Sequence, residues 1–132
     1  MPTPMTHAID GFLAYCRVEK GLAELTLDAY HRDLVAMAGY LHERFKITDP
    51  KQVKAGELSG WMAWMEGRGL SLRSIARHRV AMRQFFKYLT AEGILAENPS
   101  LLIQGPKVGR PLPTVISEAE VEAILKLSLI HI

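Results

Sequence analysis

Between positions 67 and 91 the chain carries six basic side chains and no acidic one: Arg68, Arg73, Arg77, Arg79, Arg83 and Lys87. Arginine and lysine bind phosphate oxygens, arginine can also donate to guanine edges, and Gln84 in the same stretch can pair with adenine. Exposed helices usually mix both charge signs. The absence of carboxylates therefore favours contact with the major groove of duplex DNA, and an ordinary solvated helix is the competing interpretation.

The same stretch has the spacing of an amphipathic helix that Ser71 can cap. Its apolar side chains recur by threes and fours at Leu72, Ile75, Met82, Phe86 and Leu89. At 100° per residue, the polar groups Arg73, Arg77, Gln84 and Lys87 fall on roughly the opposite side. Arg79 breaks the apolar row, so it is either a side chain at the edge of the core or an extra phosphate contact.

Three further amphipathic segments precede the basic one and would position it. Their periodicity predicts helices from about Thr6 to Lys20, from Thr26 as N-cap to about Arg44, and from about Lys54 to Arg68. Turns are predicted at Thr48-Asp49-Pro50 and at Asn98-Pro99. Because no segment alternates like a strand, we expect an all-α protein, with a four-helix bundle over residues 1–104.

The composition changes after Gln104. Residues 105–116 are rich in Pro and Gly, which predicts an extended linker. A capping box at Ser117-Glu118-Ala119-Glu120 then predicts a helix over residues 117–126, and we expect it to open a second domain of a longer protein. Residues 127–132 are similar to the in-frame translation of a transposase mosaic-end adapter used in sequencing libraries, and we interpret them as an artefact.

The composition limits the classes of protein to which the chain can belong. Hydrophobic residues make up 48% of the chain and the net charge is +2, which is typical of a globular protein. The single cysteine, Cys16, excludes an internal disulfide framework and agrees with a reducing cytosol, and its spacing places it in the core. No apolar run reaches transmembrane length and no metal-ligand spacing occurs, so we expect a cytoplasmic protein without membrane association, metal or cofactor.

Seven fragments in order carry a family resemblance: Leu25–Leu34, with the pattern T-x-x-x-Y-x-x-D-L, Ser71–Arg77, Met82–Leu89, Asn98-Pro99, Pro106-Lys107, Leu112-Pro113 and Ser117–Val121. Together they resemble the N-terminal core-binding domain of Xer-type tyrosine recombinases, within the phage integrase family. The resemblance covers about Ala8 to Lys126. It implies a SAM-like bundle of four helices that closes over one side of DNA, opposite a catalytic domain.

The resemblance also implies which residues face DNA. They are Thr26, Tyr30 and Arg32 from the second helix, Ser74, Arg77, Arg83 and Gln84 from the fourth, Arg73 and Lys87 as phosphate contacts, and Lys107 and Arg110 in the linker. One of these assignments, that of Tyr30, has a competing interpretation in the sequence, and Asp33 of the same segment is not assigned to DNA. Tyr30 also fits the apolar row as a core residue. Asp33 fits a neighbouring arginine better than DNA, because phosphates would repel it.

The chemistry of this family uses a tyrosine nucleophile, with arginines, a lysine and histidines around the scissile phosphate. No histidine here begins the family's His-x-x-Arg motif, and the tyrosines lie on predicted bundle helices. We therefore expect no catalytic residues in this chain. The resemblance implies a parent enzyme whose subunits form a tetrameric synapse on duplex DNA.

Several functions remain open at this point. Chromosome-dimer resolution by a Xer protein is favoured for the parent, and phage-type integrases share the same domain. A helical protein-interaction module whose basic face binds an acidic partner is an alternative from another class. An enzyme active by itself ranks third.

Overall fold

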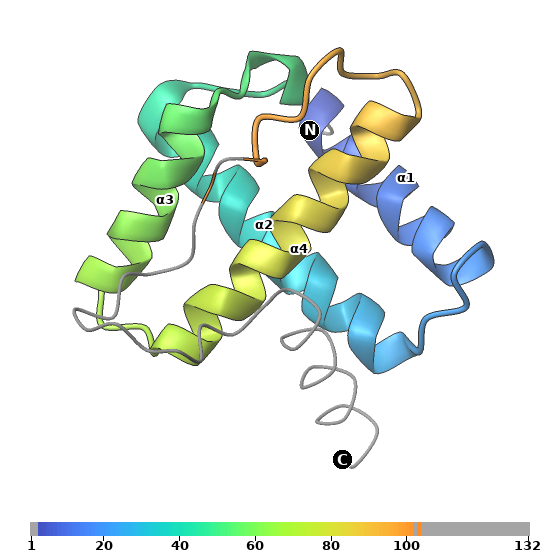
Figure 1. Cartoon of the computed structure of the whole chain (residues 1–132), viewed down its shortest axis with the longest axis horizontal. Coiled ribbons are helices and arrows are strands. Elements are labelled where there is room, and N and C mark those ends of the chain that lie inside the picture. The colour runs from blue at the N-terminus through green and yellow to red at the C-terminus, as the bar shows by residue number, and fades with distance from the viewer. Residues whose placement is uncertain (1–2, 102, 104–132) are drawn as a thin grey trace.

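The computed structural model describes residues 3–101 and 103, and this part of the chain is helical without strands (Figure 1). The elements are α1 (Pro4–Val18), α2 (Glu24–Phe45), a 3-10 helix η1 (Pro50–Gln52), α3 (Ala55–Gly67) and α4 (Leu72–Ala91). The predicted all-α fold with four principal helices is confirmed. The predicted linker, the helix over residues 117–126 and the segment 127–132 lie outside the described residues.

The helix boundaries show where local signals were sufficient. Ser71 caps α4 as predicted, because its Oγ accepts from the Ser74 backbone N at 3.1 Å. The prediction of Thr26 as the cap of α2 is wrong. That helix begins at Glu24, with Ala23 at the N-cap and no side-chain cap, and the carboxylate of Glu24 suits the positive helix end. Thr26 lies within the first turn and is only 4% exposed.

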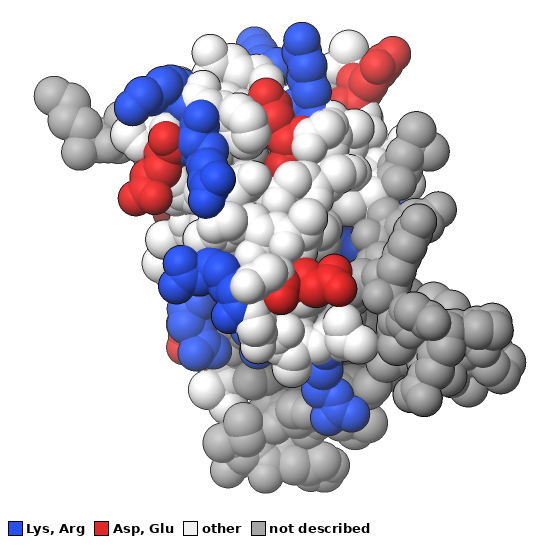
Figure 2. Space-filling model, turned by 90° about the vertical axis from the view of Figure 1, so that its left-hand side faces the viewer, with Lys and Arg blue, Asp and Glu red and all other residues white. Residues whose placement is uncertain are grey.

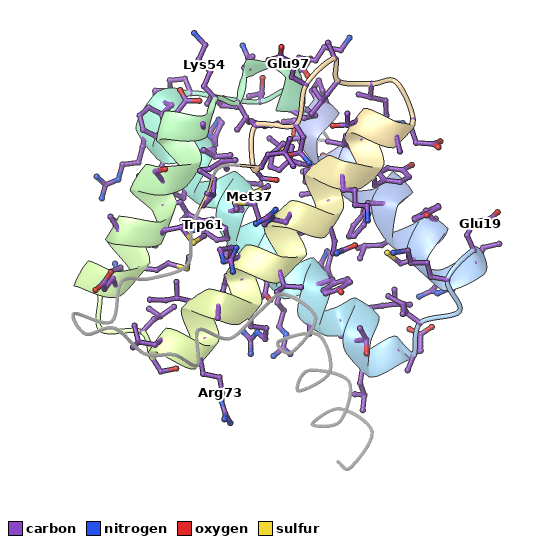
Figure 3. All side chains as sticks on the ribbon, in the orientation of Figure 1. Glu19, Met37, Lys54, Trp61, Arg73 and Glu97 are labelled. Carbon is purple, nitrogen blue, oxygen red and sulfur yellow. The ribbon has the colours of Figure 1, made fainter. Side chains whose placement is uncertain are left out.

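The two longest helices, α2 and α4, cross near the centre of the bundle, with α1 on one side and α3 on the other (Figure 1). Both α1 and α3 pack against this crossing pair. The core is formed by side chains from all four helices, and Met37 of α2 and Trp61 of α3 lie inside it (Figure 3). Because α1 and α3 pack on both sides of the crossing, much of α4 is buried, whereas α2 keeps exposed residues along its whole length.

Cys16 is a core residue, as its spacing predicted. Its side chain lies among buried residues of α1 and is 1% exposed. Burial raises the pKa of the Cys16 thiol to about 11, so the thiol stays protonated at neutral pH. None of the described helices combines the length and the apolar character that a membrane span requires.

The segment after α4 folds back on the bundle. The predicted turn at Asn98-Pro99 is present, with Asn98 Oδ1 accepting from the Ser100 backbone N at 2.9 Å. Ile103 is 3% exposed, and its carbonyl oxygen accepts from Arg79 Nη1 at 3.3 Å. Arg79 itself is 8% exposed, which supports its interpretation as a residue at the edge of the core.

Candidate nucleic-acid interface

The predicted basic face of α4 is divided along the helix. Arg73 is exposed at the N-terminal end and projects away from the bundle (Figure 3). Lys87 is exposed near the other end, about 21 Å along the axis at 1.5 Å per residue. Val80 falls between them on the same side of the helix and is only 1% exposed. The cations therefore form an N-terminal group, Arg73 and Arg77, and a C-terminal group, Arg83 and Lys87, instead of one continuous row.

The N-terminal group is joined to α2 by an ion pair. Arg77 donates from Nε to Asp33 Oδ2 at 3.2 Å and from Nη2 to Asp33 Oδ1 at 3.1 Å. The Asp33 side chain is 2% exposed and that of Arg77 is 34% exposed. Asp33 is thus the partner of a neighbouring arginine, as predicted. The helix α4 itself carries no carboxylate, and the helix crossing brings the buried one of Asp33 to it from α2.

A second side chain of α4 completes this contact. His78 Nε2 lies 3.3 Å from Asp33 Oδ1, and His78 Nδ1 lies 2.6 Å from the Ser74 carbonyl oxygen. The His78 ring also meets the Trp61 ring edge-on, with centroids 5.7 Å apart. A role for His78 could not be predicted from the sequence, since no pattern along the chain pairs positions 33 and 78. The pairing depends on the angle and register of the helix crossing.

The three predicted contacts on α2 separate into one surface residue and two buried ones. Arg32 is exposed next to Asp33. Tyr30 is 5% exposed, and its ring stacks on Phe12 with centroids 5.9 Å apart, so its core interpretation holds in this structure. Thr26 is likewise buried. On α4, Ser74, Arg83 and Gln84 are partly exposed, whereas Lys107 and Arg110 lie outside the described residues.

The face on the α3 side of the bundle differs from the crossing. Lys and Arg side chains there lie beside Asp and Glu side chains (Figure 2). Two of the arginines rest on an aromatic ring, because Arg68 Cζ is 4.9 Å and Arg44 Cζ is 5.9 Å from the centroid of Trp64. Arg68 belongs to the end of α3 and not to the basic helix. This cluster was not predicted from the sequence, although Trp64 and Arg68 are four residues apart on one helical side.

In residues 3–101 and 103, no cluster of His, Cys, Asp and Glu has the arrangement to hold a metal ion. The polar chemistry of the crossing is instead that of guanidinium groups near a buried carboxylate. Arg32 and Arg73 add exposed positive charge on the two crossing helices. Such an arrangement can attract phosphate groups and orient an arginine toward them.

Comparison with known families identifies the domain. Residues 9–93, from the first half of α1 to just beyond α4, match the family described as phage integrase, N-terminal SAM-like domain. The chain belongs to this family. The SAM-like domain therefore contains the helix crossing and both groups of cations.

The curated relatives of this SAM-like domain include tyrosine recombinases XerD and XerC. XerD of Listeria innocua is 37% identical over 94% of this chain and 42% of the relative. XerD of Pseudomonas putida is 38% identical over 96% of this chain and 42% of the relative. XerC of Bifidobacterium longum subsp. infantis is 34% identical over 91% of this chain and 33% of the relative. The chain thus spans less than half the length of these relatives. No solved structure gives a significant match.

Proposed function

We propose that this domain binds duplex DNA with sequence preference, as the N-terminal half of the clamp that a Xer-type tyrosine recombinase forms around its site. The observation that carries the proposal is the set of cations on the two crossing helices, in a domain whose relatives include tyrosine recombinases. For the parent protein we propose site-specific recombination in chromosome-dimer resolution, by a tetrameric synapse of subunits. A phage-type integrase is the second candidate, since the family description names that class.

The charge distribution supports contact with a phosphate backbone. Arg32 on α2 and Arg73 on α4 are exposed, and Lys87 adds a third exposed cation further along α4. Each phosphate that a protein cation neutralises releases condensed counterions, so the affinity of such a surface falls steeply with salt. We expect weak binding by the domain alone, because the contacts from the other half of the clamp are missing.

Titration of the chain with a duplex of about three helical turns, over a series of salt concentrations, tests the proposal. A linear fall of log affinity with log salt, and competition by unlabelled duplex, are the expected results. Polyglutamate serves as the matched polyanion. Tighter binding to polyglutamate than to duplex would instead support a protein-interaction module with a basic face.

We further propose that phosphoryl transfer belongs to another part of the parent protein. Tyr30 and Tyr40 are buried, at 5% and 8% exposure, which disfavours attack on a DNA phosphate by either residue. The ring centroids of Tyr88 and Tyr15 are 5.0 Å apart. Burial raises the pKa of the Tyr88 hydroxyl, which disfavours its phenolate form. Incubation with a nicked suicide duplex should therefore yield no covalent adduct, and an adduct on a denaturing gel would refute this.

A further inference from the structure

We propose that Asp33 is a positioning residue that fixes the orientation of the Arg77 guanidinium toward DNA. The inference rests on the proposed function and concerns how the same surface distinguishes one DNA sequence from another. Asp33 lies at 2% side-chain exposure and does not itself face a ligand. Its effect on DNA must therefore act through Arg77.

The carboxylate is held from more than one side. Asp33 Oδ1 accepts from Arg77 Nη2 at 3.1 Å and lies 3.3 Å from His78 Nε2, while Oδ2 accepts from Arg77 Nε at 3.2 Å. His78 is in turn restrained by the contact of its Nδ1 with the Ser74 carbonyl oxygen at 2.6 Å. Rotation of the carboxylate would disrupt these contacts together, so its orientation is well defined.

The planar guanidinium transfers this orientation to its outer edge. A guanidinium has five N–H groups in a fixed fork, and Asp33 takes one from Nε and one from Nη2. The two N–H groups of Nη1 and the second of Nη2 remain on the edge away from Asp33. Because Asp33 is buried and 34% of the Arg77 side chain is exposed, we assign that exposure to the edge away from Asp33. It matches the pair of acceptors on guanine, or a phosphate, as a two-point donor.

This arrangement differs from that of Arg73, which is exposed at the start of α4 and has the freedom of a surface side chain. A mobile arginine contributes positive charge to binding, whereas a restrained one also presents its N–H groups in a fixed direction. Donors with a fixed direction can distinguish the acceptors on base edges from the uniform phosphate backbone. Arg77 is therefore the group on this surface best suited to sequence preference. Asp33 supports that role despite carrying the charge that DNA repels.

The test compares Asp33→Asn with Asp28→Asn in the intact chain. Asp28 is an exposed carboxylate on the same helix, so each change removes one negative charge from α2. Affinities are measured for two duplexes. One is enriched from a random pool by the unsubstituted chain, and the other is a scrambled duplex of equal composition. Circular dichroism melts define a temperature at which each variant is folded.

We expect Asp33→Asn to reduce the preference for the enriched duplex by about tenfold, because an asparagine cannot receive both donors of the fork. Its affinity for the scrambled duplex should stay equal or rise, and its salt dependence should be unchanged. Asp28→Asn should leave the preference intact. Arg77→Lys, which keeps the charge and loses the fork, should reduce the preference as Asp33→Asn does, and combining the two should add little.

The outcomes separate this inference from the proposed function. If the unsubstituted chain binds no duplex, the proposed function fails and this inference fails with it. If the unsubstituted chain binds duplex but Asp33→Asn keeps the same sequence preference, Asp33 only packs the helices and the inference fails alone. Should Asp33→Asn not fold, retention of the preference by Arg77→Lys would refute the inference equally. Binding of duplex by the unsubstituted chain without enrichment of any sequence would also contradict the inference.

Discussion

At the N-terminal end of α4 the guanidinium of Arg77 is held by the buried carboxylate of Asp33, whereas near the C-terminal end the ammonium of Lys87 lies exposed on the surface. Both residues belong to the same amphipathic pattern and look equivalent on a helical wheel. They differ because α2 crosses α4 close to Arg77. The comparison shows that a tertiary contact can turn one cation of a row into an oriented donor while another remains a diffuse charge.

The largest effect is expected where the crossing itself is disrupted. Leu34 is 0% exposed and follows Asp33 in α2, so Leu34→Ala should lower the free energy of unfolding by about 2–5 kcal/mol. Val35→Ala is the matched control, since Val35 is 48% exposed and its truncation should change stability by less than about 0.5 kcal/mol. Urea denaturation followed by circular dichroism measures both. Equal effects of the two changes would contradict the described packing.

The next largest effect on stability is expected at Arg77, in comparison with Arg73, the other arginine of the N-terminal group. Arg77→Ala leaves Asp33 buried without its main partner, and should lower the free energy of unfolding by about 1–3 kcal/mol, less than for a fully buried pair because Arg77 is 34% exposed. Arg73→Ala removes an exposed charge and should change it by less than about 0.5 kcal/mol. Thermal and urea unfolding distinguish these results, and similar values for both variants would show that the Asp33 contact adds no stability.

A smaller effect is expected at the start of the basic helix. Ser71→Ala removes the oxygen that accepts from the Ser74 backbone N, and should cost about 1 kcal/mol of stability. Ala23→Ser provides the reciprocal test at α2, whose N-cap has no side-chain acceptor, and should raise stability. A Ser71→Ala variant as stable as the unsubstituted chain would mean that other groups accept from the backbone N–H groups at this end of the helix.

The smallest effect concerns the exposed cation of the C-terminal group. Lys87→Ala should weaken binding evenly across duplex sequences and lower the slope of log affinity against log salt by about one. Arg77→Ala should instead change sequence preference, because its fork is oriented. Fluorescence anisotropy over a salt series, with two duplexes of different sequence, measures both. If the two variants behave alike, the contrast between the two ends of α4 has no role in binding.

Much of the fold could be predicted because its signals are local. The spacing of apolar residues located all four helices, and Ser71 and the Asn98-Pro99 turn were identified from side chains that bond within a few residues of themselves. The boundary of α2 was predicted wrongly because a good capping residue, Thr26, stands two residues inside the helix. In the structure Thr26 occupies the third helical position and its side chain is buried.

The candidate interface was only partly predictable. The sequence by itself determined the cations of α4, their helical spacing and the likeness to a recombinase domain, because these depend on residue types and distances along the chain. Only the tertiary structure decided that Tyr30 and Thr26 are buried, that Val80 divides the basic row, and that Arg77 and His78 meet Asp33. Those outcomes depend on the angle and register at which α2 crosses α4, and the packing of side chains far apart in the sequence sets both.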